Sequence, residues 1–264
     1  MTSRGFRSSL ECKSLVSFAA ASLLLVGAAV AAPVPVEGGA KTYKNCMALA
    51  NKDPDAALEA AFGWQDMGGG DAARHCVAVA LFNLGQFAQA AVRFENLAGV
   101  MQTAPKTERA RVLAQAGTAW MRAEDLERAH AAQSAALRLA PNDSEILIDR
   151  AMTLAGAKNY WEAIDDLNRV LEAQPNRVDA LILRASAYRF VDALPLARQD
   201  ADAAFRLAPE RPEVLLEYGI LQRLGGDREG ARRTWLTLIR LHEGTPAGDA
   251  AQRNLELLDV QVER

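Results

Sequence analysis

The sequence has few aromatic residues and few of the residue types that build β-sheets. Aromatic side chains make up 6% of the 264 residues, although half of the chain is apolar. Alanine and leucine dominate that apolar half, whereas strands favour valine, isoleucine, threonine and aromatic rings. The composition therefore predicts closely packed helices and an all-α fold.

A surface of one charge sign is also missing. The 30 Lys and Arg residues are scattered among 33 Asp and Glu residues, which gives a formal net charge of −3. Nucleic-acid binding requires a basic patch or stripe, because the phosphate backbone supplies most of the affinity. We therefore expect no nucleic-acid partner.

Residue patterns that carry catalysis are absent from the sequence. There is no phosphate-binding glycine loop with its lysine, no serine nucleophile motif and no histidine pair on one helix face. His75 beside Cys76 suggests a zinc site with Cys46, but zinc prefers four ligands and no fourth is evident. We expect no catalytic residue, no cofactor and no metal site, so the protein is predicted not to be an enzyme.

The first 31 residues resemble an export signal. Three basic residues precede an apolar run at 15–30, and small residues follow it. This order is typical of a secretory signal that is removed. We expect cleavage after Ala31, because Pro33 would directly follow a cut made one residue later. The predicted location is periplasmic or secreted; the alternative is membrane anchoring by the uncleaved segment, although the run is short for a membrane span.

Removal of residues 1–31 takes away three basic residues and one acidic residue, which changes the formal charge from −3 to −5. Two cysteines remain, Cys46 and Cys76. In an oxidising compartment such a pair suggests a disulfide. Closing this loop would add roughly 3 to 4 kcal/mol of stability by the chain-entropy estimate. The alternative is two buried free thiols that pack as small apolar groups.

A 34-residue period runs through the middle and C-terminal part of the chain. Each unit has the pattern of two amphipathic helices, with small residues where the helices cross. A proline closes most units, and it cannot donate to a continuing helix. The equivalent positions are Ala129, Ala163, Ala197 and Ala231; Leu113, Leu147, Leu181 and Leu215; Leu137, Leu171, Phe205 and Ile239; Gly117, Ala151, Ala185 and Gly219; and Pro141, Pro175 and Pro209.

This order of small residue, large residue, turn, alanine and closing proline resembles the tetratricopeptide repeat, a family of stacked helix-turn-helix modules. The resemblance implies an all-α, right-handed α-solenoid with a C-terminal capping helix. We predict a signal peptide at 1–31, a flexible linker at 32–42, an N-terminal helical pair at 43–70, repeats at 71–109, 110–143, 144–177, 178–211 and 212–245, and a capping helix at 246–264. The repeat at 71–109 is displaced in phase by five residues, so its connection to the next repeat must be longer.

In this family the first helices of the repeats line a concave groove. The resemblance places these residues in the groove: Met121, Ile148, Met152, Ile182, Ser186, Arg189, Ile220 and Arg223. We expect the apolar ones to receive a peptide or helix of a partner, while Arg189 and Arg223 orient its polar groups. The alternative is that the apolar residues are core, because the superhelix is tight or the capping helix folds inward.

These features predict a non-enzymatic scaffold or adaptor in the bacterial periplasm or cell envelope, with a protein or peptide as partner. No membrane insertion is expected after signal cleavage. The alternative is an accessory subunit that presents substrate to an envelope enzyme or maturation complex. A repeat fold constrains the mode of action more than the biological process, because surface residues select the partner.

Overall fold

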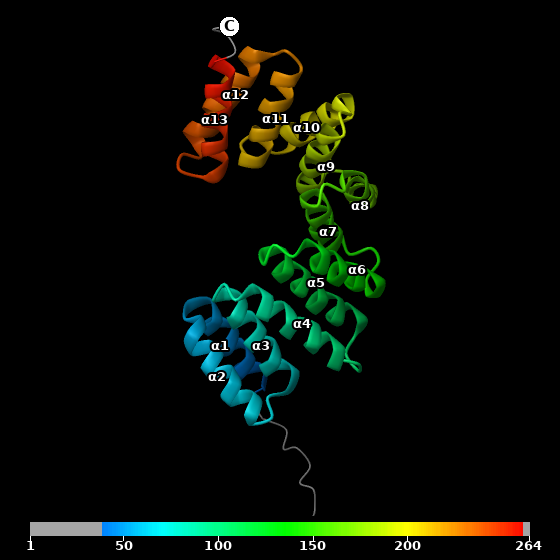
Figure 1. The fold of residues 1–264 in the computed structure, drawn as a ribbon, viewed down its shortest axis with the longest axis vertical. Coiled ribbons are helices and arrows are strands. Elements are labelled where there is room, and N and C mark those ends of the chain that lie inside the picture. The colour runs from blue at the N-terminus through cyan, green and yellow to red at the C-terminus, as the bar shows by residue number, and fades with distance from the viewer. Residues whose placement is uncertain (1–38, 261–264) are drawn as a thin grey trace, which may run out of the picture. The chain divides into compact units, whose positions relative to one another are not determined.

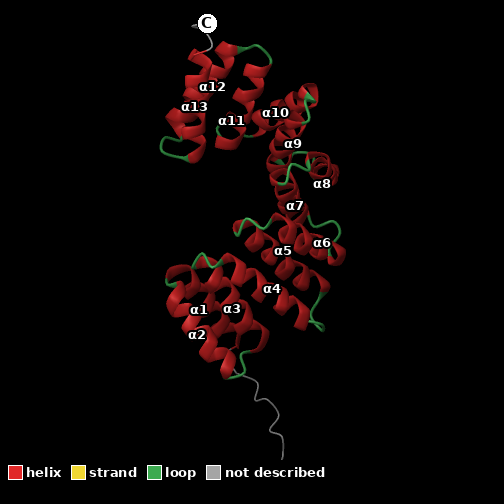
Figure 2. Cartoon of the chain, in the orientation of Figure 1, coloured by secondary structure: helices red, strands yellow, loops and turns green. Residues whose placement is uncertain are grey.

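The computed structural model of the protein describes residues 39–260. Within that range it contains thirteen α-helices and no strand, which confirms the all-α prediction (Figures 1 and 2). The predicted signal peptide lies outside the described residues. The helices are α1 (Gly39–Lys52), α2 (Pro54–Asp66), α3 (Gly70–Asn83), α4 (Phe87–Val100), α5 (Lys106–Arg122), α6 (Leu126–Leu139), α7 (Ser144–Gly156), α8 (Tyr160–Ala173), α9 (Val178–Phe190), α10 (Leu194–Leu207), α11 (Pro212–Leu224), α12 (Arg228–Leu241) and α13 (Pro246–Val260).

The helices form an α-solenoid, because each one packs mainly against its neighbours along the chain. The first helices of successive repeats also touch one another: α5 contacts α7, α7 contacts α9, and α9 contacts α11. We call the surface of α3, α5, α7, α9 and α11 the first-helix face. None of the helices in residues 39–260 combines the length and apolar character that crossing a bilayer requires.

In two of the repeat hairpins, a glycine of the first helix lies directly against a side chain of the second helix. In the last repeat a Cβ atom at Gly219 would lie 2.3 Å from Nε1 of Trp235, which is fully buried. In the repeat of α5 and α6, a Cβ atom at Gly117 would lie 2.5 Å from Cγ of Gln133. Glycine therefore stands where a large side chain crosses the helix axis, and it permits the close approach.

The turn inside each hairpin has a left-handed residue at the same position of the repeat. These residues are Glu124, Lys158, Asp192 and Gly226, with φ of 62°, 64°, 58° and 87°. The residue that follows is the N-cap of the second helix. Asp125 and Asp227 accept a hydrogen bond from the backbone amide three residues further on, at 3.0 and 2.8 Å. Asn159 is the N-cap of α8, but its side chain makes no capping bond.

Two buried ion pairs join the helices of the central repeats. Arg150 donates two hydrogen bonds of 2.7 Å to Asp166 and one of 3.0 Å to Ser134 of the preceding repeat. One repeat later, Arg184 donates bonds of 2.7 and 2.8 Å to Asp200. Both carboxylates are buried, so these bidentate contacts hold each hairpin in a defined register.

The N-terminal helices are joined to the repeats by a disulfide. Cys46 of α1 and Cys76 of α3 form the predicted bond, with their Cα atoms 6.3 Å apart. Asp53 caps α2 through a 3.1 Å bond from the amide of Ala56, and α2 begins at Pro54. Helix α5 begins at Lys106, four residues before the start expected from the period, because Pro105 already occupies its N-cap position.

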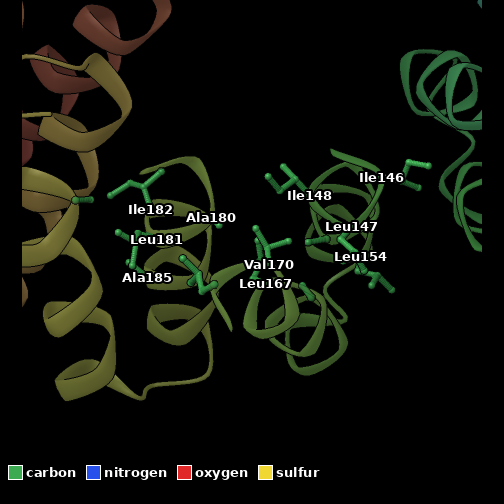
Figure 3. Close-up of a cluster of buried hydrophobic side chains, with 14 of the residues drawn as sticks. Ile146, Leu147, Ile148, Leu154, Leu167, Val170, Ala180, Leu181, Ile182 and Ala185 are labelled. Carbon is green, nitrogen blue, oxygen red and sulfur yellow. The ribbon is translucent and has the colours of Figure 1, made fainter. Parts of the chain in front are cut away.

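The core runs through the repeats and ends at the capping helix. In Figure 3, Leu167 and Val170 of α8 lie between side chains of α7 and α9. At the C-terminal end, Ala251 and Leu258 of α13 pack against Trp235 and Leu238 of α12. Helix α13 therefore covers the apolar edge of the last repeat, as a capping helix does.

The Gly219 crossing gives a stability prediction. Gly219→Ala should destabilise the protein by about 2 kcal/mol or more, because the new methyl group overlaps the buried Trp235 ring. The matched control is Gly63→Ala in α2, where no atom lies within 4 Å of the added Cβ. That change should stabilise the protein by roughly 0.5 to 1 kcal/mol.

The measurement is the urea midpoint of both variants against the unmodified chain. Equal shifts of the same sign would show that helix propensity, and not the close crossing, decides the effect at Gly219.

Candidate partner-binding face

Hydrogen bonds and ion pairs link the first helices of neighbouring repeats across the first-helix face. His75 of α3 lies 2.8 Å from the amide oxygen of Gln115 in α5. Thr118 of α5 lies 3.5 Å from the carboxylate of Asp149 in α7. These contacts place residues from separate repeats next to one another, so the face is one continuous surface on α3, α5 and α7.

Two of the predicted groove residues lie inside the protein. Ile148 and Ile182 are 6% and 7% exposed, and both belong to the core that Figure 3 shows. Adjacent first helices pack closely, and these side chains fill the space between repeats. The prediction that they receive a partner is therefore wrong, and the alternative interpretation as core holds at these positions.

Arg189 and Ser186 are also occupied by contacts within the protein. The guanidinium of Arg189 donates bonds of 2.6 and 3.0 Å to Glu217 of α11, and one of 3.2 Å to the hydroxyl of Ser186. It lies 4.4 Å from the centre of the Phe190 ring. Glu217 is buried, so Arg189 neutralises an internal carboxylate. This pairing corrects the expected role of Arg189 in orienting a partner.

The other predicted groove residues retain accessible surface. Met152 is 42% exposed, which is high for an apolar side chain. Met121 is partly buried, and its sulfur accepts a 3.7 Å hydrogen bond from Thr153. Ile220 is partly buried against the C-terminal core. Arg223 is partly exposed, and no acidic side chain of the described part of the chain lies within 4 Å of it.

In the first turns of α7, α9 and α11, most acidic side chains form ion pairs with arginines of the protein itself. Arg177 donates bonds of 2.8 and 3.0 Å to Glu145 and one of 3.2 Å to Asp179. Arg211 contacts Asp179 as well, and it donates a 3.2 Å bond to Glu213. The result is a row of alternating charges across α7, α9 and α11. The row follows the 34-residue period, because Arg177 and Arg211 are 34 residues apart, so the sequence carries a signal for it outside the apolar positions.

Asp149 differs from these carboxylates. Burial raises its pKa, as do the nearby charges of Glu145 and Asp143, against a smaller opposing effect of the Thr118 hydrogen bond. Among residues 39–260, no Lys, Arg or His nitrogen lies within 4 Å of its oxygens. The face therefore carries a half-buried negative charge that the described chain does not compensate.

Comparison with known proteins identifies the fold. A family model for the tetratricopeptide repeat matches residues 116–187. No curated protein sequence matches the chain. A solved tetratricopeptide repeat protein from Parabacteroides merdae is 15% identical, with a TM-score of 0.69 over 84% of this chain and 89% of that one.

Two further structures share the fold. The MamA protein of Desulfovibrio magneticus RS-1 is 20% identical, with a TM-score of 0.58 over 67% of this chain and 97% of that chain. YrrB, described as a TPR protein with an unusual peptide-binding site, is 16% identical. Its TM-score is 0.52, over 69% of this chain and 91% of that chain. The family match over residues 116–187, the 34-residue period and the hairpin packing agree, and the described part of the chain has the tetratricopeptide-repeat fold.

Proposed function

We propose that the protein is a non-enzymatic adaptor that holds a peptide segment of a partner protein on the first-helix face. Tetratricopeptide repeats generally serve as interaction scaffolds, and the structurally similar YrrB is described as having a peptide-binding site. A preformed face also favours binding, because the adaptor loses little conformational entropy when the partner arrives.

The observation that carries this proposal is the surface around Asp149 and Met152. The two residues are three positions apart on α7, so their side chains lie on the same side of the helix. Asp149 supplies an uncompensated carboxylate, and Met152 supplies an exposed, flexible apolar surface. A lysine or arginine of the partner fits both, because its aliphatic stem covers the methionine while its charge meets the carboxylate.

We also propose that the protein acts in the bacterial periplasm or cell envelope after export. The basic and apolar pattern of residues 1–31 supports this, and so does the disulfide between Cys46 and Cys76, since such bonds persist in oxidising compartments.

N-terminal sequencing of the protein recovered from the periplasmic fraction should give a chain that begins at Ala32. Recovery from the membrane fraction with residues 1–31 still attached would contradict cleavage and favour the anchored alternative.

Photocrosslinking tests the binding face. A photoreactive amino acid at Met152 should capture a partner protein in the native cell, because this side chain is exposed on the proposed face. The matched control carries the same amino acid at Asp165, which is exposed on the second helix α8.

Mass spectrometry of the crosslinked bands identifies the partner and the segment bound. Equal capture from both positions, or capture from Asp165 alone, would exclude the first-helix face. If the captured protein is an enzyme and its turnover rises with the adaptor present, the protein is an accessory subunit that presents substrate.

Asp149→Asn should separate stability from binding. The folded state raises the pKa of this carboxyl group, so its ionisation costs stability as pH rises above the unfolded value of about 3.9. The variant should therefore be more stable than the unmodified protein at pH 7, and equally stable at pH values below both pKa values. It should also bind the captured peptide about tenfold or more weakly, because a charge-assisted contact is lost.

Thermal unfolding at several pH values and fluorescence anisotropy with the labelled peptide measure the two effects. Unchanged affinity in a folded variant would show that Asp149 does not contact the partner.

A further inference from the structure

A cavity of about 550 Å³ lies at the N-terminal end of the first-helix face, where α1, α3 and α5 meet the end of α4. Its apolar lining comes from Leu97, Met101 and Val112, of which Leu97 and Val112 are almost fully buried. This volume falls in the range of sites that enclose a ligand group. The cavity is separate from the surface around Asp149 and Met152, which does not line it.

One side of the cavity is a chain of polar groups from three helices. The hydroxyl of Tyr43 in α1 lies 3.0 Å from Nδ1 of His75, and Nε2 of His75 lies 2.8 Å from the amide oxygen of Gln115. Burial lowers the pKa of His75, against an opposing effect of the Gln115 bond, so the ring is neutral at pH 7. The tautomer that satisfies both contacts accepts from Tyr43 and donates to Gln115.

That arrangement leaves polar groups free to meet a ligand. The amide NH₂ of Gln115 has no hydrogen-bond partner among the described residues, and the Tyr43 oxygen retains acceptor capacity. Together they offer a donor and an acceptor, which a peptide backbone group can use. The polar wall therefore suits a peptide backbone, and the apolar wall suits a side chain.

The rim of the cavity carries charges of both signs. Asp71 receives a 2.8 Å bond from Arg74, so its charge is balanced. Glu108 and Arg111 also line the cavity, and they lie three positions apart on α5. Because the rim charges are balanced, the rim gives no preference for a charged group inside the cavity. The buried apolar wall then decides what enters.

We propose that this cavity receives one large apolar side chain, such as leucine, methionine or phenylalanine, from the peptide that occupies the first-helix face. The inference rests on the proposed function, and it adds the identity of an anchoring residue. Gln115 and Thr118 lie one helical turn apart on α5, and Thr118 contacts Asp149. The cavity and the Asp149 carboxylate are therefore on neighbouring helices of one face.

The geometry also sets the spacing in the partner. Neighbouring packed helices are on the order of 10 Å apart, and an extended chain advances about 3.3 Å per residue. An anchor in the cavity and a basic side chain on Asp149 are then about three residues apart. The partner segment has the form apolar-x-x-basic, in either chain direction.

Helix α1 holds one wall of this cavity in place. Tyr43 lies one turn before Cys46, whose disulfide joins α1 to α3 beside His75. At the other end of α1, the side chain of Asn83 donates a 2.8 Å bond to the carbonyl of Ala50. The disulfide is therefore expected to maintain the cavity as well as stability.

The test uses labelled peptides with leucine three positions from arginine, and versions with leucine or arginine replaced by alanine. Loss of the leucine should weaken binding to the oxidised protein by about tenfold, because the apolar contact of its side chain with the cavity wall is lost. Ala72→Phe, which fills the cavity from α3, should weaken binding of the leucine peptide similarly and should not weaken binding of its alanine version further.

Ala60→Phe, at an exposed position of α2, is the control and should bind like the unmodified protein. Circular dichroism and thermal unfolding show whether Ala72→Phe folds; if it does not, Ala114→Phe, which fills the cavity from α5, provides the second variant with the same expected loss. Full binding of the leucine peptide by a folded cavity variant would overturn the pocket.

The two proposals fail in different ways. If replacing the leucine leaves the affinity unchanged, but replacing the arginine or Asp149 lowers it, the pocket proposal is wrong and the binding-face proposal stands. If the unmodified protein binds none of the peptides, the apolar-x-x-basic partner is wrong, while crosslinking from Met152 still decides the face itself.

Discussion

The close crossing of two helices inside each repeat is the contact on which the rest of the structure depends. It requires that the first helix has a very small residue where a large side chain of the second helix passes, as Gly219 does opposite Trp235. With the hairpin closed, the apolar edges of neighbouring hairpins come together and bury their alanines and leucines. The first helices then touch one another, which creates a continuous face and removes some of its side chains from solvent.

The same stacking determines which charges remain available for a partner. Arg189 is drawn into a pair with Glu217 because α9 and α11 are adjacent, and Arg150 is committed to Asp166 within its own hairpin. Such pairs add little net stability, since burying charges carries a desolvation penalty. Asp149 is conspicuous on this face because no cation of residues 39–260 meets it.

Much of the fold could be predicted from the sequence, because a 34-residue period of small, large and proline residues specifies hairpins and their order. The disulfide between Cys46 and Cys76 could also be predicted, because only these two cysteines remain after signal cleavage and the expected compartment is oxidising. The burial of Ile148 and Ile182 could not be predicted in this way. A period shows which side of a helix a residue occupies, but it does not show how closely the next repeat approaches. A usable signal for ion pairs was present: Arg150 with Asp166 recurs as Arg184 with Asp200, one period later.

The irregular part of the repeat array also contains the cavity at the N-terminal end of the first-helix face. A regular stack fills the space between its first helices with core side chains, as it does around Ile182. Between α3 and α5 the phase is displaced, α5 begins early at Lys106, and Met101 at the end of α4 lines a cavity. Helix α1, which lies outside the period, closes that space with Tyr43, and the disulfide joins it to α3. Departure from the period thus produces the cavity, while the period itself produces the face beside it.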